Sequence, residues 1–141
     1  MKSIYENLSD QKFTKLKLEL GKLEEKIIPF CNENMISLDR ERFYSEGLGI
    51  NLHKQEKELN YHSSLFYLNN KGAAKFSFGI LISYDTEKGR FYKRETLAEA
   101  KPLEYFDSNI IDLLKQSLEL YHSWHKSDLK EYIEFTSPPN Y

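Results

Sequence analysis

The amino-acid sequence predicts an α+β domain: an antiparallel sheet of three to five strands with long N- and C-terminal helices packed on one face. Three observations carry this prediction. An apolar stripe at helical spacing runs through residues 13–27, a second one begins near residue 107, and strand-like alternation divided by turn residues fills much of the chain between them. We expect one domain over residues 1–141, because this length is typical of a single hydrophobic core.

Apolar residues at steps of three or four predict the first helix. They are Phe13, Leu16, Leu20, Leu23 and Ile27. Asn7 or Ser9 is expected to cap its start. Pro29 is expected to end it, because a proline disfavours the helical conformation of the residue before it, here Ile28.

Residues 30–60 carry the weakest pattern. Short strands fit residues 35–38 and 47–52, whereas the polar run 53–60 predicts a solvated loop. The chain then becomes clearer, with a strand over 61–68, a turn over 69–72 that contains asparagine and glycine, and a strand over 73–84.

The strand over 73–84 alternates, so its two faces can be assigned. Phe76, Phe78, Ile80, Ile82 and Tyr84 are expected to face the core. If the turn pairs Leu68 with Ala73, the preceding strand places Tyr61, Ser63 and Leu65 on the core face as well. His62, Ser64 and Phe66 then share the open face with Gly79 and Leu81, and a slip of one residue would invert this assignment.

After a turn at 85–89, a third strand is expected over 90–97, and the turn length leaves open whether Phe91 or Tyr92 faces inward. Residues 98–105 are predicted to be a connection. A long helix over 107–135, capped by Asp107 or Ser108, is predicted to end the domain. The tail 136–141 contains two prolines and is expected to be mobile.

Composition argues against several classes of function. The net charge of −2 argues against a protein that binds nucleic acid by neutralising phosphates. No apolar run approaches the length of a membrane span, and the lone Cys31 cannot form an intrachain disulfide. We therefore expect a cytoplasmic protein with no membrane contact.

Few residues could carry chemistry. His122 and His125 have the spacing of half a zinc site, but no third ligand is evident. Cys31 would need a base such as His53 or His62 to act as a nucleophile, and nothing in the spacing brings them together. We predict no catalytic residues, no metal and no cofactor.

The open sheet face is the remaining candidate for a binding surface. Gly79 and its serine neighbours make it shallow, and His62, Phe66 and Leu81 add apolar contact area. Such a mixed patch predicts contact with a partner protein.

The layout resembles that of small bacterial immunity proteins, the antitoxins that neutralise a cognate toxin. The shared features are the opening Ile4-Tyr5-Glu6, the aromatic hairpin through Phe78 and Tyr84, the turn Lys88-Gly89 and an acidic last helix. The resemblance implies a non-catalytic, stoichiometric inhibitor of a toxin or nuclease domain. Its acidic contacts would be Asp112, Glu119, Asp128, Glu131 and Glu134.

Two other functions stay open at this point. One is a small-ligand module with a pocket between sheet and helices, lined by Tyr61, Tyr67 and Tyr84. The other is a metalloenzyme that uses His122 or His125. The sequence leaves the oligomeric state and the identity of the partner unspecified.

Overall fold

The computed structural model describes residues 10–39, 49–56, 58–70, 73–87, 89–129 and 131–134. Its elements, in order, are α1 (Asp10–Glu33), β1 (Ser37–Asp39), β2 (Gly49–Glu56), β3 (Leu59–Asn70), β4 (Ala73–Asp85), β5 (Gly89–Lys101), α2 (Leu103–Ser123), a 3-10 turn η1 (Lys126–Asp128) and β6 (Glu131–Glu134).

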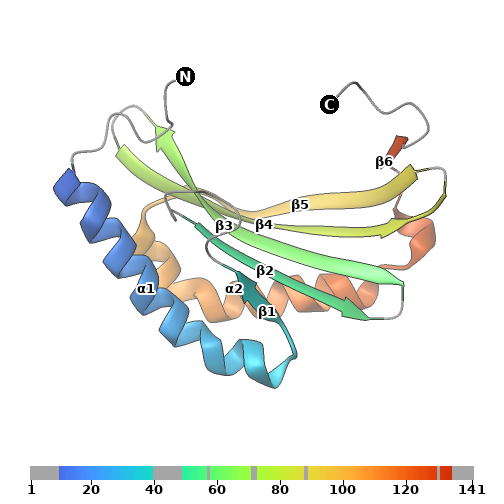
Figure 1. The fold of residues 1–141 in the computed structure, drawn as a ribbon, viewed down its shortest axis with the longest axis horizontal. Helices are drawn as coiled ribbons and strands as arrows, with labels where there is room; N and C mark the ends of the chain where they lie inside the picture. Colours follow the sequence, from blue (N-terminus) through green and yellow to red (C-terminus); the bar gives the residue numbers. More distant parts are fainter. Residues whose placement is uncertain are drawn as a thin grey trace.

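The six strands form one antiparallel sheet whose spatial order follows the sequence. Four strands, β2 to β5, are long, and β1 and β6 are short strands at the two edges. Both helices lie on the same side of the sheet (Figure 1), which confirms the predicted α+β class and the one-sided packing. Within the described residues, no helix is long and apolar enough to cross a membrane.

The central hairpin, β3–β4, has the predicted faces with a different register. Asn70, not Leu68, pairs with Ala73, so the strands run two residues further before they turn. A shift of two residues keeps every side chain on its face, because side chains alternate with a period of two. Tyr61 and Leu65 are therefore buried on the helix side, as expected, and His62 pairs with Leu81 on the other side.

Helix α1 contradicts the prediction that it ends at Ile28. It continues through Pro29 to Glu33. Proline removes one backbone donor, but Pro29 is exposed, where water can hydrogen-bond the freed carbonyl. The turn beyond it places Cys31 in the core at 2 % exposure, and this burial favours continuing the helix. Asn7 and Ser9, the expected caps, lie outside the described residues.

The C-terminus of α1 closes with a Schellman motif built on a methionine. The N–H of Ile36 donates to the carbonyl of Cys31 over 2.8 Å, and the N–H of Met35 donates to that of Asn32 over 3.4 Å. Met35 has a φ of 57°, the left-handed conformation that this motif requires and that glycine usually provides. Its side chain is 82 % exposed, so packing does not compensate for the strained backbone.

We therefore expect Met35→Gly to raise the free energy of unfolding by about 0.5–1 kcal/mol, because glycine adopts a positive φ without a Cβ clash and its greater freedom in the unfolded chain offsets part of the gain. Urea denaturation measures the change. Met35→Ala, which keeps the Cβ, is the matched control and should match the parent chain within about 0.5 kcal/mol. A glycine variant less stable than the alanine variant would contradict this account of the strain.

Residues 53–60 are not the predicted solvated loop. Strand β2 runs on to Glu56 and β3 begins at Leu59, so the two strands meet in a short hairpin. Contacts distant in sequence hold it: Lys54, whose side chain is 9 % exposed, donates to the carbonyl of Asn34 at the end of α1. Of the two predicted short strands, residues 37–38 lie in β1 and residues 49–52 in β2. Residues 35–36 precede β1, and residues 47–48 lie outside the described part of the chain.

The last helix also differs from the prediction. It begins earlier, at Leu103 instead of Asp107, because Leu103 and Phe106 extend the buried stripe by one turn. It ends at Ser123 instead of running to residue 135. The chain then forms η1 and adds β6 to the edge of the sheet beside the start of β5.

Tyr61 links α2 to the sheet. It also fills the space between sheet and helices in which a ligand pocket was predicted. Its side chain is 0 % exposed, and its hydroxyl lies 2.6 Å from the hydroxyl of Ser117 on α2 and donates to Ser63 over 3.0 Å. Tyr67 is buried, and its ring makes an edge-to-face contact with that of Phe76. These two tyrosines fill the core, so they do not line a pocket between sheet and helices.

Strand β5 shows that Phe91, and not Tyr92, faces inward, a choice that the turn length left open. Phe91 pairs with Tyr84, and their rings stack at 5.0 Å on the helix side. Both rings pack against the core, whereas Tyr92 pairs with Ser83 on the open side. Strand β5 also continues to Lys101, through residues that were predicted to be a connection.

Candidate functional site on the uncovered sheet face

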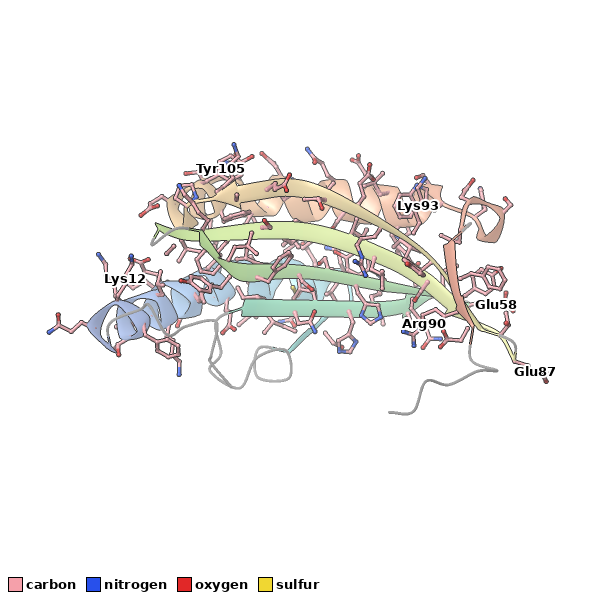
Figure 2. The ribbon with its side chains drawn as sticks, turned by 90° about the horizontal axis from the view of Figure 1, so that it is seen from above. Lys12, Glu58, Glu87, Arg90, Lys93 and Tyr105 are labelled. Carbon is pink, nitrogen blue, oxygen red and sulfur yellow. The ribbon has the colours of Figure 1, made fainter. Side chains whose placement is uncertain are left out.

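The side of the sheet that faces away from the helices carries a hollow of about 480 Å³. No helix of the described chain covers this side, and Figure 2 views it directly, with the helices behind the strands. The hollow brings together residues from all four long strands: Asn51, His62, Ser64, Phe66, Gly79, Ile80, Leu81, Arg94, Glu95 and Thr96. The predicted trio His62, Phe66 and Leu81 is therefore on one surface.

The floor of the hollow depends on Gly79. This residue pairs with Thr96 on β5 and with Ser64 on β3, so small side chains surround a position that has none. A Cβ atom at Gly79 would lie 3.1 Å from the carbonyl oxygen of Glu95, closer than nine in ten real Cβ contacts. Glycine thus allows β5 to approach β4 closely here, next to the irregular pairing near Phe78.

The polar groups of the hollow include hydrogen-bond donors. The hydroxyl of Ser64 donates to Asn51 Oδ1 over 2.9 Å, which leaves the amide N–H groups of Asn51 as donors. Arg94 is exposed, and its guanidinium lies 5.9 Å from the ring of Tyr92. Among the described residues Arg94 has no acidic partner. Glu95 alternates to the other side of β5, since it pairs with Ile80.

His62 is the histidine that lines this hollow. Its ring lies 6.3 Å from that of His53, the residue opposite it on β2. Burial is the main cause that lowers the pKa of His62 below its ordinary value, and the nearby charges of His53 and Arg90 lower it further, against Asp85. A negative charge bound in the hollow would counteract this lowering and favour the protonated form of His62.

The acidic residues expected from the resemblance belong to three different elements. Asp112 and Glu119 are exposed on α2, in the layer opposite the hollow. Asp128 lies in η1, where its carboxylate accepts the backbone N–H of His125 over 2.7 Å. Glu131 and Glu134 belong to β6, so the expectation that they extend an acidic helix is wrong. The side chains of these two glutamates lie outside the described part of the chain.

A smaller hollow, of about 250 Å³, lies between the end of α2 and the β2–β3 turn, and His122 and His125 contribute to it. His122 Nε2 is 3.3 Å from Glu56 Oε2, and Lys54 lies 2.8 Å from the other oxygen. The hydrogen bond from Lys54 is the main cause that lowers the pKa of Glu56, with a smaller contribution from His122. Among the described residues, no group of three or more histidine, cysteine or acidic side chains is placed to hold a metal.

Cys31 does not meet the histidines considered as its base. It is buried in the helix layer, and burial raises the pKa of its thiol, which disfavours the nucleophilic thiolate. His53 and His62 lie on the opposite side of the sheet. This arrangement offers Cys31 a packing role.

The geometry of the hollow also shows which of its residues the sequence pattern missed. Asn51, Arg94 and Thr96 come from strands whose register depended on uncertain turns. Their alternation with buried neighbours could have placed them on the open face once that register was known.

Comparisons of the chain with family models, with curated proteins and with solved structures find no match.

Proposed function

We propose that this chain is a non-catalytic protein-binding module whose uncovered sheet face docks a partner protein. One observation carries the proposal: His62, Phe66 and Leu81 converge on a hollow of about 480 Å³ in a sheet face that no described helix covers. Apolar side chains inside a polar border are typical of protein interfaces. The balanced net charge of −2 supports a protein partner over a nucleic acid.

The layout that resembles immunity proteins supports a biological setting for this binding. In that setting the chain is a bacterial, cytoplasmic inhibitor that occupies a cognate toxin in a stoichiometric complex. The free, buried Cys31 is consistent with a reducing compartment. Inhibition by docking requires no catalytic group in the inhibitor.

Affinity capture from the native host, followed by mass spectrometry, tests the proposal when it is done with matched variants. Thr96→Trp places a large ring beside Gly79 and fills the hollow, whereas Gln116→Trp makes the same change on the exposed face of α2. We expect the parent chain and Gln116→Trp to capture one stoichiometric protein. Thr96→Trp should bind it at least about tenfold more weakly, a loss of about 1.4 kcal/mol.

Two results of this experiment would contradict the proposal. Equal capture by both tryptophan variants would remove the sheet face from the interface. Capture of no protein by the parent chain would argue against a binding module. Thermal unfolding of each variant shows whether the substitution leaves the fold intact, so that a lost interaction is not mistaken for a lost structure.

The exposed acids of α2 are a second candidate contact in the same experiment. Asp112 and Glu119 lie two turns apart, about 10 Å along the helix axis, with the exposed Lys115 between them. If these acids form the contact, the double variant Asp112→Lys/Glu119→Lys would lose capture of the partner while Thr96→Trp retained it. That result would mean that the partner binds α2 and not the sheet face.

The hollow also has a size that suits small molecules, whose pockets commonly measure about 300–1,000 Å³. Small-ligand binding is therefore the second candidate function. A thermal-shift screen of metabolites tests it, because a ligand that binds only the folded state must raise the apparent stability.

A further inference from the structure

We infer that the open edge of β5 binds an extended segment of a partner protein, which adds to the sheet as a further strand through the backbone groups of Arg94 and Thr96. This inference goes beyond the proposed function, because strand addition uses the edge of the sheet and does not require that the hollow is occupied. Its basis is the short length of β6, which leaves most of this edge without a neighbouring strand in the described chain.

Strand β6 covers only one end of β5. It pairs with residues 89–92 of a strand that is 13 residues long. Leu129, two residues before β6, is buried in the core, so the chain leaves the edge at that point. Residues 93–96 are four exposed residues in succession, although successive side chains of a strand point to opposite faces. This pattern is typical of an edge strand that nothing covers.

The turn before β5 shows which backbone groups point toward β4. The N–H of Thr86 donates to the carbonyl of Gly89 over 2.7 Å, and the N–H of Gly89 donates back over 3.4 Å. Pairing continues without a shift as far as Thr96, and hydrogen-bonded pairs alternate along antiparallel strands. The N–H and C=O groups of Lys93 and Glu95 therefore point toward β4.

The backbone groups of Arg94 and Thr96 point the other way, because these residues alternate with Lys93 and Glu95. Within the described chain, neither residue has a strand partner on that side. Such a row of backbone donors and acceptors can pair with the backbone of an added strand. Beyond Thr96 the pairing with β4 becomes irregular, so the added strand is short.

Helix α2 provides apolar area beside this edge. Lys93 Nζ lies 5.0 Å from the ring of Trp124, and Lys101 Nζ lies 5.5 Å from the ring of Tyr105, so α2 runs along the edge. Figure 2 shows Tyr105 and Lys93 toward opposite ends of β5. Trp124, Tyr105 and Leu97 are only partly buried. We therefore expect the bound segment to carry apolar side chains at alternate positions, on the side that faces α2.

A second copy of this chain fits the edge less well. A symmetric antiparallel pair centred on Arg94 places two arginines opposite each other, and one centred on Glu95 places two glutamates opposite each other. A pair centred on Thr96 runs into the irregular pairing that follows it. The occupant is therefore a segment of a different protein.

Amide hydrogen exchange of the full chain, followed by NMR, tests the backbone geometry. In the free protein, the N–H groups of Arg94 and Thr96 should exchange faster than those of Lys93 and Glu95. Random dodecapeptides, displayed and selected on the full chain, provide the bound state. An enriched peptide should contain alternating apolar residues and should slow exchange at Arg94 and Thr96 at least about tenfold.

Arg94→Pro and Arg94→Ala are matched variants for the affinity of the enriched peptides. Both remove the charged side chain, but only proline removes the backbone N–H, and an outward-facing edge position tolerates proline. We expect the affinity to fall at least about tenfold with Arg94→Pro and to stay within about threefold with Arg94→Ala. Thermal unfolding shows whether both variants are folded, and if the proline variant is not, exchange in the parent chain decides.

The outcomes separate failure of this inference from failure of the proposed function. Peptides that leave Arg94 and Thr96 exchanging rapidly, or that bind both Arg94 variants equally, would overturn strand addition. If Thr96→Trp weakens those same peptides, docking at the hollow survives. Slow exchange of Arg94 and Thr96 in the free protein, or selection that enriches no peptide, would also overturn the inference.

Discussion

Replacement of Tyr61 by alanine is expected to lower the free energy of unfolding by about 3–5 kcal/mol, as is typical when a large buried ring is removed. Tyr61 is fully buried in β3, its ring lies 5.4 Å from that of Tyr121, and its hydroxyl meets Ser117 on α2. Alanine removes the ring and the polar contact together, and it leaves a cavity between sheet and helix.

Tyr61→Phe separates these two contributions. It keeps the ring and removes only the hydroxyl, and Ser117 still donates to the carbonyl of Leu114 over 2.7 Å. We expect a loss of about 1–2 kcal/mol, near the cost of one buried hydrogen bond. Urea denaturation measures both variants. A loss below about 1 kcal/mol for Tyr61→Ala would mean that α2 is not packed on β3 as described.

The second large effect is expected at Tyr121, which holds the β2–β3 turn to α2. Its hydroxyl accepts the backbone N–H of Glu56 and donates to the carbonyl of Leu59, each over 2.8 Å. Tyr121→Phe keeps the ring and removes both hydrogen bonds, so the free energy of unfolding should fall by about 2 kcal/mol. In amide exchange, the N–H of Glu56 should lose its protection.

Tyr105→Phe is the matched control for Tyr121→Phe. Tyr105 lies on the same helix, and its hydroxyl makes no hydrogen bond with the described residues. Its substitution should change the stability by less than about 0.5 kcal/mol. Equal effects of the two substitutions would contradict the role assigned to Tyr121 in fixing the turn.

The sequence predicted the parts of the fold that short-range patterns determine. Alternation in β4 placed Phe78 and Ile80 inside, and a hairpin register that was wrong by two residues left each face correct. For the same reason, His62 and Leu81 were expected on one surface, and the structure places both in the hollow.

The parts that were mispredicted depend on contacts between distant segments. The polar residues 53–60 form a hairpin because Tyr121 and Asn34, from other elements, bind its backbone and its Lys54 side chain. No glycine or proline marks the end of α2 at Ser123, yet the chain leaves the helix and adds β6 to β5. Pairing at a sheet edge leaves no local signal in the sequence, which is why this segment was predicted to be helical.

The central claim, that the sheet face is the docking surface, is tested most directly by protection of introduced cysteines. Thr96→Cys places a thiol in the hollow, Gln116→Cys places one on α2, and the native Cys31 is 2 % exposed and should react slowly. Both introduced thiols should alkylate rapidly in the free protein. With the captured partner bound, we predict that Thr96→Cys reacts at least about tenfold more slowly while Gln116→Cys is unaffected. Unchanged alkylation of Thr96→Cys, or protection of Gln116→Cys alone, would contradict the claim.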